Sequence, residues 1–211
     1  MSGNRVTQKQ MVARETILDI AEQLIRDGES GSFTLRDLAT AAGVSLSTPF
    51  QYFGSKAGIR ANLAYRMLRD ISDIYCASSI SDDAIDNVFL MANVGANYLL
   101  SDPKYYRCIC KSIEEDGFSE RNTLVRPKAE QLWRLALSAG NLSRPDTDAL
   151  SKTYLPQLLA VIFRGILIMW VNGELSDSEL RNAIESSLAG TLLGFVDDER
   201  RDKLIARMSV F

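Results

Sequence analysis

The sequence contains no histidine, the residue that most often shuttles protons and binds metals in proteins. Histidine-based acid-base catalysis is therefore excluded, and a zinc-type site is disfavoured. Ser45 and Ser47 have no histidine that could activate them as nucleophiles. We expect no catalytic residue, no metal site and no cofactor, and we predict that the protein is not an enzyme.

Cysteine and long apolar runs are also scarce. The three cysteines, Cys76, Cys108 and Cys110, are too few for a disulfide framework, which fits a reducing cytoplasm. The longest apolar candidate, residues 158–171, is interrupted by Arg164 and falls short of the ~18 residues that a membrane span needs. The N-terminus lacks the apolar core of a secretory signal. We therefore expect a cytoplasmic protein without a membrane partner.

Strand signals are missing as well, because no segment alternates between apolar and polar residues with turn residues at its ends. Apolar residues instead recur at the helical period, and 46% of the 211 residues are apolar, enough for a core. The sequence predicts an all-α protein with helices over residues 11–27, 34–42, 45–53, 56–76, 82–100, 104–116, 123–139, 146–171, 178–197 and 199–208.

The net charge of −3 is unevenly distributed along the chain. The first 70 residues carry nine basic and seven acidic side chains, and the remainder carries fifteen basic and twenty acidic ones. Residues 1–14 hold Arg5, Lys9 and Arg14 and no acidic residue. Residues 1–10 are either a frayed terminus or a basic arm that reaches phosphates or the minor groove of DNA.

Residues 34–56 form the most informative stretch, because they read as helix, tight turn and helix. Thr34 and Asp37 have the spacing of a capping box. Gly43 follows the first apolar stripe, where the chain must turn, and Ser45 can cap the second helix. This pattern is typical of a helix-turn-helix, although an ordinary helical hairpin has the same spacing. The uncharged donors and acceptors of the second helix favour groove edges over a core.

The same stretch resembles the recognition-helix signature of TetR-type transcriptional regulators. Gly43, Val44 and Ser45 match its start, and an aromatic pattern and a lysine match its end at Phe50, Tyr52, Phe53 and Lys56. A proline at position 49 departs from the pattern. Either the second helix starts late, with Thr48 as its cap, or its first turn is distorted.

The resemblance implies which residues contact DNA. Tyr52 and Lys56 match positions that touch phosphates, whereas Ser47, Thr48 and Gln51 are expected to supply most of the base readout. The full set of candidate DNA-binding residues is Thr34, Arg36, Ser45, Leu46, Ser47, Thr48, Phe50, Gln51, Tyr52 and Lys56.

The resemblance also implies a C-terminal dimer and a ligand site in the middle helices. Small residues and wide apolar stripes favour a four-helix dimer bundle through Ile166, Trp170, Leu188 and Leu192, with an intramolecular core as the alternative. Aromatic residues at helical spacing are either core or ligand-lining. The ligand-lining candidates are Phe89, Tyr98, Tyr105, Tyr106, Ile109, Phe118, Trp133, Tyr154 and Phe163, with Arg164 or Tyr105 as polar anchor and a kink at Pro156.

Together these features predict a DNA-binding head at 1–55 and a helical ligand-binding and dimerisation body at 56–211. We interpret the chain as a transcriptional regulator, a repressor that binds a palindromic operator as a homodimer and is released by a hydrophobic small molecule. The alternatives are a helical adaptor that binds only protein, and an α-helical enzyme that binds a hydrophobic small molecule without binding DNA.

Overall fold

The computed structural model describes residues 2–28, 33–115, 125–138, 142 and 148–208. Within this part of the chain, the secondary structure is entirely helical, which confirms the all-α prediction. The helices are α1 (Ser2–Asp27), α2 (Leu35–Ala41), α3 (Ser47–Phe53), α4 (Lys56–Cys76), α5 (Ala84–Leu100), α6 (Pro103–Glu115), α7 (Val125–Ala136), α8 (Asp148–Val171), α9 (Leu180–Leu192) and α10 (Asp198–Met208).

Among the helix starts that differ from the sequence prediction, those of α1 and α5 have a clear local cause. Helix α1 begins at Ser2, so residues 2–10 are helical rather than an arm. The first proline of the chain is Pro49, and the Gln, Lys and Arg residues of this segment are good helix formers, so no proline stops the helix early. Helix α5 is capped by Asp83 and begins at Ala84, two residues after the predicted start at residue 82. The Asp83 Oδ1 atom accepts a hydrogen bond from the Ile85 N–H at 2.7 Å.

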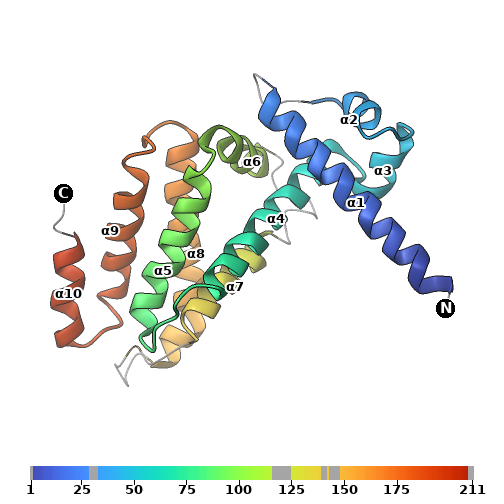
Figure 1. The fold of residues 1–211 in the computed structure, drawn as a ribbon. Coiled ribbons are helices and arrows are strands. Elements are labelled where there is room, and N and C mark those ends of the chain that lie inside the picture. The colour runs from blue at the N-terminus through green and yellow to red at the C-terminus, as the bar shows by residue number, and fades with distance from the viewer. Residues whose placement is uncertain (1, 29–32, 116–124, 139–141, 143–147, 209–211) are drawn as a thin grey trace.

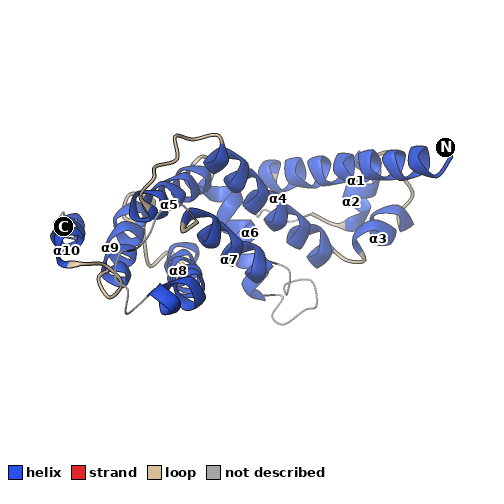
Figure 2. Cartoon of the chain, turned by 90° about the horizontal axis from the view of Figure 1, so that it is seen from below, coloured by secondary structure: helices blue, strands red, loops and turns tan. Residues whose placement is uncertain are grey.

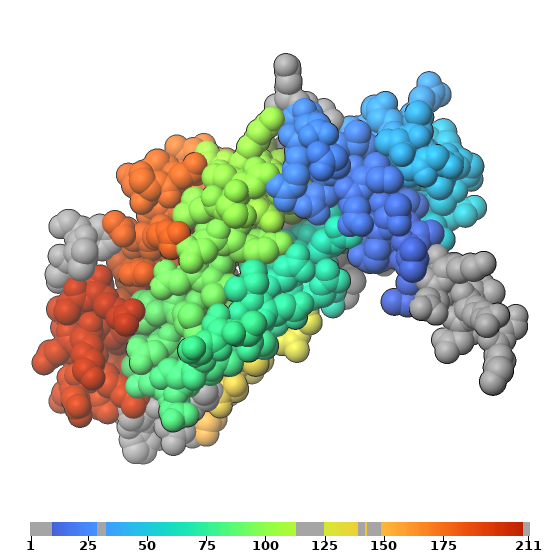
Figure 3. Space-filling model, viewed as in Figure 1, coloured from blue at the N-terminus to red at the C-terminus, as the bar shows by residue number. Residues whose placement is uncertain are grey.

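The ten helices form a small head and a larger body (Figure 1). We call α1–α3 the head and α4–α10 the body. Helix α4 starts beside the head and runs to the far end of the body, and α10 lies at the opposite end of the molecule from the head (Figures 1 and 3). Seen from below, the molecule is elongated, and the N-terminal part of α1 extends past α2 and α3 (Figure 2).

The head has a compact apolar centre. Ile17 and Ala21 of α1 pack with Leu38 of α2 and Phe53 of α3, and each is at most 3% exposed. Phe33 closes this centre and is buried, as the sequence predicted. The three short head helices therefore present one fixed surface, because their inner faces are occupied by their own side chains.

Helix α8 is mostly apolar, and its polar residues after the first turn are few, namely Lys152, Thr153, Gln157 and Arg164. It continues through the buried Pro156 and packs on α6, α7 and α9. Residues 149–171 are long and apolar enough to cross a membrane by length and composition, with 28% of the most apolar window buried. This window is longer than the segment 158–171 considered from sequence, because it also includes the apolar residues before Leu158. Much of this apolar helix therefore lies on the surface of the single chain.

Candidate nucleic-acid interface

Helix α2 begins at a complete capping box. The Thr34 Oγ1 atom accepts a hydrogen bond from the Asp37 N–H at 3.1 Å, and the Thr34 N–H donates to Asp37 Oδ2 at 2.9 Å. These hydrogen bonds from Thr34 lower the pKa of the Asp37 carboxyl. The capping box predicted from sequence is confirmed, and it sets where α2 starts.

The turn between α2 and α3 depends on Gly43. Its φ of 63° is one that glycine adopts without strain. Its N–H donates to the Thr40 carbonyl at 3.1 Å, and the Val44 N–H donates to the Ala39 carbonyl at 3.0 Å. Both bonds satisfy carbonyl groups at the end of α2, so the turn that aims α3 is well defined.

Helix α3 starts at Ser47, and Pro49 lies in its first turn. The first N–H groups of a helix have no partner within the helix, so a proline there costs no backbone hydrogen bond. Helix α3 therefore starts later than the predicted Ser45 and earlier than in the alternative that has Thr48 as its cap. The predicted cap at Ser45 is wrong, because the cap residue is Leu46 and makes no side-chain hydrogen bond. The Ser45 hydroxyl instead lies 2.9 Å from the Thr48 hydroxyl.

One face of α3 is packed and the other is open. Pro49 and Phe53 are buried, whereas Leu46 is 53% and Phe50 60% exposed. Gln51 is exposed as well. Of the remaining predicted contact residues on the head, Thr48 is half-buried. The others are exposed to solvent, namely Thr34, Arg36, Ser45 and Ser47. We call Leu46, Ser47, Phe50 and Gln51 the recognition face.

The two predicted phosphate contacts, Tyr52 and Lys56, are half-buried at the edge of this face. The Lys56 Nζ atom lies 5.1 Å from the centroid of the Phe33 ring. Burial lowers the pKa of Lys56, and the nearby Arg60 lowers it further. Lys56 is the first residue of α4, so it lies where the recognition face meets the helix that runs from the head into the body.

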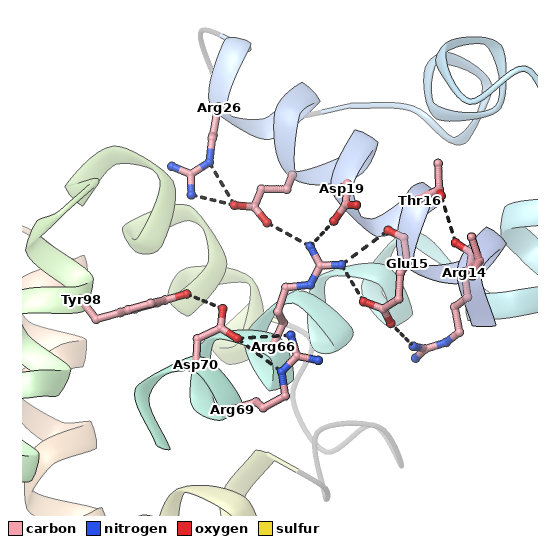
Figure 4. Close-up of polar contacts among 11 residues, drawn as sticks. Arg14, Glu15, Thr16, Asp19, Arg26, Arg66, Arg69, Asp70 and Tyr98 are labelled. Carbon is pink, nitrogen blue, oxygen red and sulfur yellow. Dashed lines mark hydrogen bonds and ion pairs between the residues drawn. The ribbon is translucent and has the colours of Figure 1, made fainter. Parts of the chain in front are cut away.

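A network of ion pairs that sequence analysis missed fastens α1 to α4 (Figure 4). Arg66 of α4 binds three carboxylates of α1, those of Glu15 at 2.9 Å, Asp19 at 2.6 Å and Glu22 at 3.3 Å. The Arg66 side chain is 14% exposed. Burial by itself lowers the pKa of Arg66, but the hydrogen bonds to Asp19 and Glu15 outweigh it and raise the pKa.

Arg26 connects the same helix α1 to the body. Its guanidinium binds Glu22 at 2.7 Å, pairs with Asp102, and stacks over the Tyr105 ring at 4.0 Å from the centroid. Glu22 is four residues before Arg26 on the same helix, whereas Asp102 and Tyr105 are far away in sequence, so no local pattern could have indicated these two partners. Charged side chains of α1 and α4 therefore contribute to holding the head on the body.

The predicted ligand residues fall into two groups. Phe89, Tyr105, Tyr106, Ile109 and Trp133 are buried in the body, and Tyr98 and Phe163 are partly buried. Tyr154 is 54% exposed and Arg164 is also exposed, so neither belongs to the core of the single chain. Phe118 lies outside the described residues. Sequence could not identify the outward face of α8, because apolar residues occur on several sides of that helix.

The predicted dimer residues are buried within the single chain. Ile166 is 7% exposed, and Trp170, Leu188 and Leu192 are fully buried. The structure assigns them to the intramolecular core, which is the alternative that the sequence left open. The large apolar side chains on the outside of α8 are different residues, namely Leu150, Tyr154, Leu158, Val161 and Met169.

Comparison with known proteins places this geometry among bacterial regulators. Residues 17–63 match the family model described as bacterial regulatory proteins, tetR family. The HTH-type transcriptional regulator AlkX of Mycobacterium tuberculosis is 33% identical over 87 residues, which is 40% of this chain. The matched segment spans about a third of that relative, 35% of its length.

Two solved structures share the overall fold. A TetR transcriptional regulator from Rhodococcus sp. RHA1 superposes with a TM-score of 0.65 at 20% identity, over 87% of this chain and 97% of that one. A tetR-family transcriptional regulator from Streptomyces coelicolor has a TM-score of 0.59 at 13% identity, over 94% of this chain and 88% of that one. The similarity in fold thus covers both the head and the body.

Proposed function

We propose that the chain is a DNA-binding transcriptional regulator of the TetR type, and the match of residues 17–63 to the family model of bacterial regulatory proteins, tetR family, supports this. The observation that carries this proposal is the recognition face of α3. Its side chains are free because the opposite face, with Pro49 and Phe53, occupies the core of the head. A short helix held in this way can enter the major groove.

The chemistry of the recognition face suits base edges. Gln51 can bind adenine through two hydrogen bonds, and Ser47 can reach either a base or a phosphate. Phe50, 60% exposed, offers an apolar surface of the kind that contacts thymine methyl groups. Lys56 and Tyr52 at the edge supply contacts that position the helix without reading sequence.

We further propose that the protein acts as a homodimer through the outer face of α8. Leu150, Tyr154, Leu158, Val161 and Met169 follow one another at helical spacings along this face, with Gly165 between the last two. A Cβ atom at Gly165 would meet no atom within 4 Å, so a partner helix could approach closely there. An exposed apolar stripe of this length is unusual on a monomer, and pairing with a second copy would cover it.

Two-fold pairing of this kind relates two heads, which fits a palindromic operator with half-sites roughly 34 Å apart. A repressor that responds to a hydrophobic small molecule is the form of regulation that we propose for the body. The ion pairs of Arg26 and Arg66 support it, because a ligand that prefers another arrangement of the body would shift the heads.

The test is selection of fragmented native genomic DNA by the purified full chain, followed by sequencing of the retained fragments and anisotropy measurements on the motif found. We expect a palindromic motif that is bound at least a thousandfold more tightly than random DNA. Binding that does not exceed that of random DNA would overturn the proposal and favour a helical adaptor that binds only protein.

A further inference from the structure

Tyr75 is a buried side chain whose polar atom is not satisfied. It is the penultimate residue of α4, it is 1% exposed, and its hydroxyl has no hydrogen-bond partner in the described part of the chain. An unpaired buried hydroxyl destabilises a fold, so each instance in a native structure calls for an explanation. The C-terminal end of α4 lies in the body, at the end remote from the head (Figure 1).

The other buried polar side chains of the described residues are engaged. Asn87 accepts a hydrogen bond from the Ser81 N–H at 2.9 Å and donates to the Ser81 carbonyl at 2.7 Å. The Ser112 hydroxyl donates to the Ile109 carbonyl at 2.7 Å, and Ser151 also has a partner. The Nε atoms of two half-exposed arginines, Arg60 and Arg107, also lack partners. Each of these guanidinium groups has further N–H donors.

The surroundings of Tyr75 disfavour water as its partner. Helix α4 packs on α5, α6 and α7, and the buried residues that precede Tyr75 on this helix are apolar, namely Met67, Leu68 and Ile71. A buried water needs two to four polar partners. The other buried polar side chains of the described residues are already engaged, so they offer little to hold a water beside this hydroxyl.

We propose that the Tyr75 hydroxyl is the hydrogen-bonding anchor for an uncharged, largely apolar effector that binds in the body beside the C-terminal end of α4. This inference rests on the proposed function, since it names the ligand class of the regulator. The effector carries one polar group for the hydroxyl and no charge, because the described body residues include no buried charged side chain. Burial raises the pKa of Tyr75, so its hydroxyl stays protonated and able to donate at neutral pH.

This assignment replaces the two anchors predicted from sequence. Arg164 is exposed on α8, and Tyr105 is stacked against Arg26 at the head–body junction. The position of Tyr75 also connects the ligand to the head, because α4 is continuous from Tyr75 to Lys56 at the edge of the recognition face. A shift of one end of this helix moves the other end.

The experiment compares wild type with Tyr75→Phe, using 2-decanone, 1-decanol and 4-butylphenol as probes in thermal-shift and calorimetric titrations. Without a probe, Tyr75→Phe should melt at the wild-type temperature or above it, because an unpaired hydroxyl is removed. Its affinity for the probes should fall about tenfold, the loss expected for one hydrogen bond. Tyr65→Phe is the matched control on the same helix, since Tyr65 is 42% exposed, and it should leave probe binding unchanged.

Three results would overturn the inference: no probe binds wild type, Tyr75→Phe binds the probes as tightly as wild type does, or its melting temperature falls by several degrees. The last would show that the hydroxyl already has a partner within the protein. Operator binding, measured by anisotropy on the same samples, separates this failure from that of the proposed function. A protein that binds its operator but not the probes retains the function and loses only this ligand class.

Discussion

At the scale of single residues, we expect different side chains to recognise bases and to contact phosphates. Gln51 is exposed and free to turn towards a base edge, whereas the Thr48 hydroxyl is half-buried and bonded to Ser45. We therefore expect Gln51 to carry more of the base discrimination than Thr48 does. Lys56 lies at the border of the face, with its stem over Phe33, and is placed to neutralise a phosphate.

Gln51→Ala should relax the base preference at one position of each half-site. A bidentate pair between glutamine and adenine discriminates by about 1–3 kcal/mol, and alanine cannot make it. The measurement is selection from a randomised DNA pool. Gln23→Ala on α1 is the control, because Gln23 is exposed and bonds only to its neighbour Asp27 among the described contacts. Identical sequence preferences for Gln51→Ala and wild type would remove Gln51 from base readout.

Lys56→Ala should weaken binding to specific and random DNA alike and reduce the salt slope by about one. Because burial lowers the pKa of Lys56, wild-type affinity should also begin to fall at a lower alkaline pH than an exposed lysine would cause. Salt titrations by anisotropy measure both effects. Lys203→Ala, at an exposed position on α10, should leave the slope unchanged. An unaltered slope for Lys56→Ala would place the residue outside the interface.

At the scale of helices, α1 and α4 are joined by charge across an otherwise apolar head. Arg66 is the centre of this contact, because one guanidinium holds Glu15, Asp19 and Glu22. Arg26 extends the contact from α1 to the start of α6 through Asp102 and Tyr105. The head can therefore tilt when these few contacts change, while its apolar centre stays intact.

Arg66→Met should lower the free energy of unfolding by about 1–2 kcal/mol, because the three α1 carboxylates lose their partner. The effect is limited because Glu15 and Asp19 are 45% and 66% exposed and water screens their charges. Urea unfolding at low and high salt measures this, and high salt should reduce the difference. Arg69→Met is the control, since Arg69 is 52% exposed and pairs with its neighbour Asp70. Equal effects for the two variants would contradict a special role for Arg66.

At the scale of the whole molecule, α8 is the helix through which we propose that two chains meet. Its inner face holds Ile166 and Trp170 in the core of the chain, and its outer face leaves Tyr154, Val161 and Met169 exposed. The same helix therefore serves the monomer core on one side and the proposed dimer seam on the other.

Val161→Glu should convert the dimer into a folded, soluble monomer, because a charge in an apolar seam would be buried and unpaired. Val161 is 58% exposed in the single chain, so the fold itself should tolerate the change. Leu188→Glu should instead unfold the protein, since Leu188 is fully buried. Sedimentation and circular dichroism distinguish the two outcomes. A Val161→Glu protein that remains dimeric would move the interface away from this face of α8.

The sequence by itself determined the features that depend on neighbours within a few residues. The capping box of Thr34 and Asp37, the turn at Gly43 and the span of α4 from Lys56 to Cys76 agree with prediction. Caps, turns and helical periodicity involve contacts between residues at most about five apart, so a single sequence contains all their partners. The helix-turn-helix, and with it the family, could be recognised for this reason.

Only the tertiary structure decided which side of each helix is covered and which distant charges meet. Trp170 and Leu188 were expected at a dimer seam but are core residues, because the apolar stripes of α8 and α9 do not show whether the helix that covers them belongs to the same chain. The pairing of Arg26 with Asp102 and the unpaired hydroxyl of Tyr75 depend on how helices pack. Burial and long-range pairing are properties of the assembled core, and helical periodicity carries no record of them.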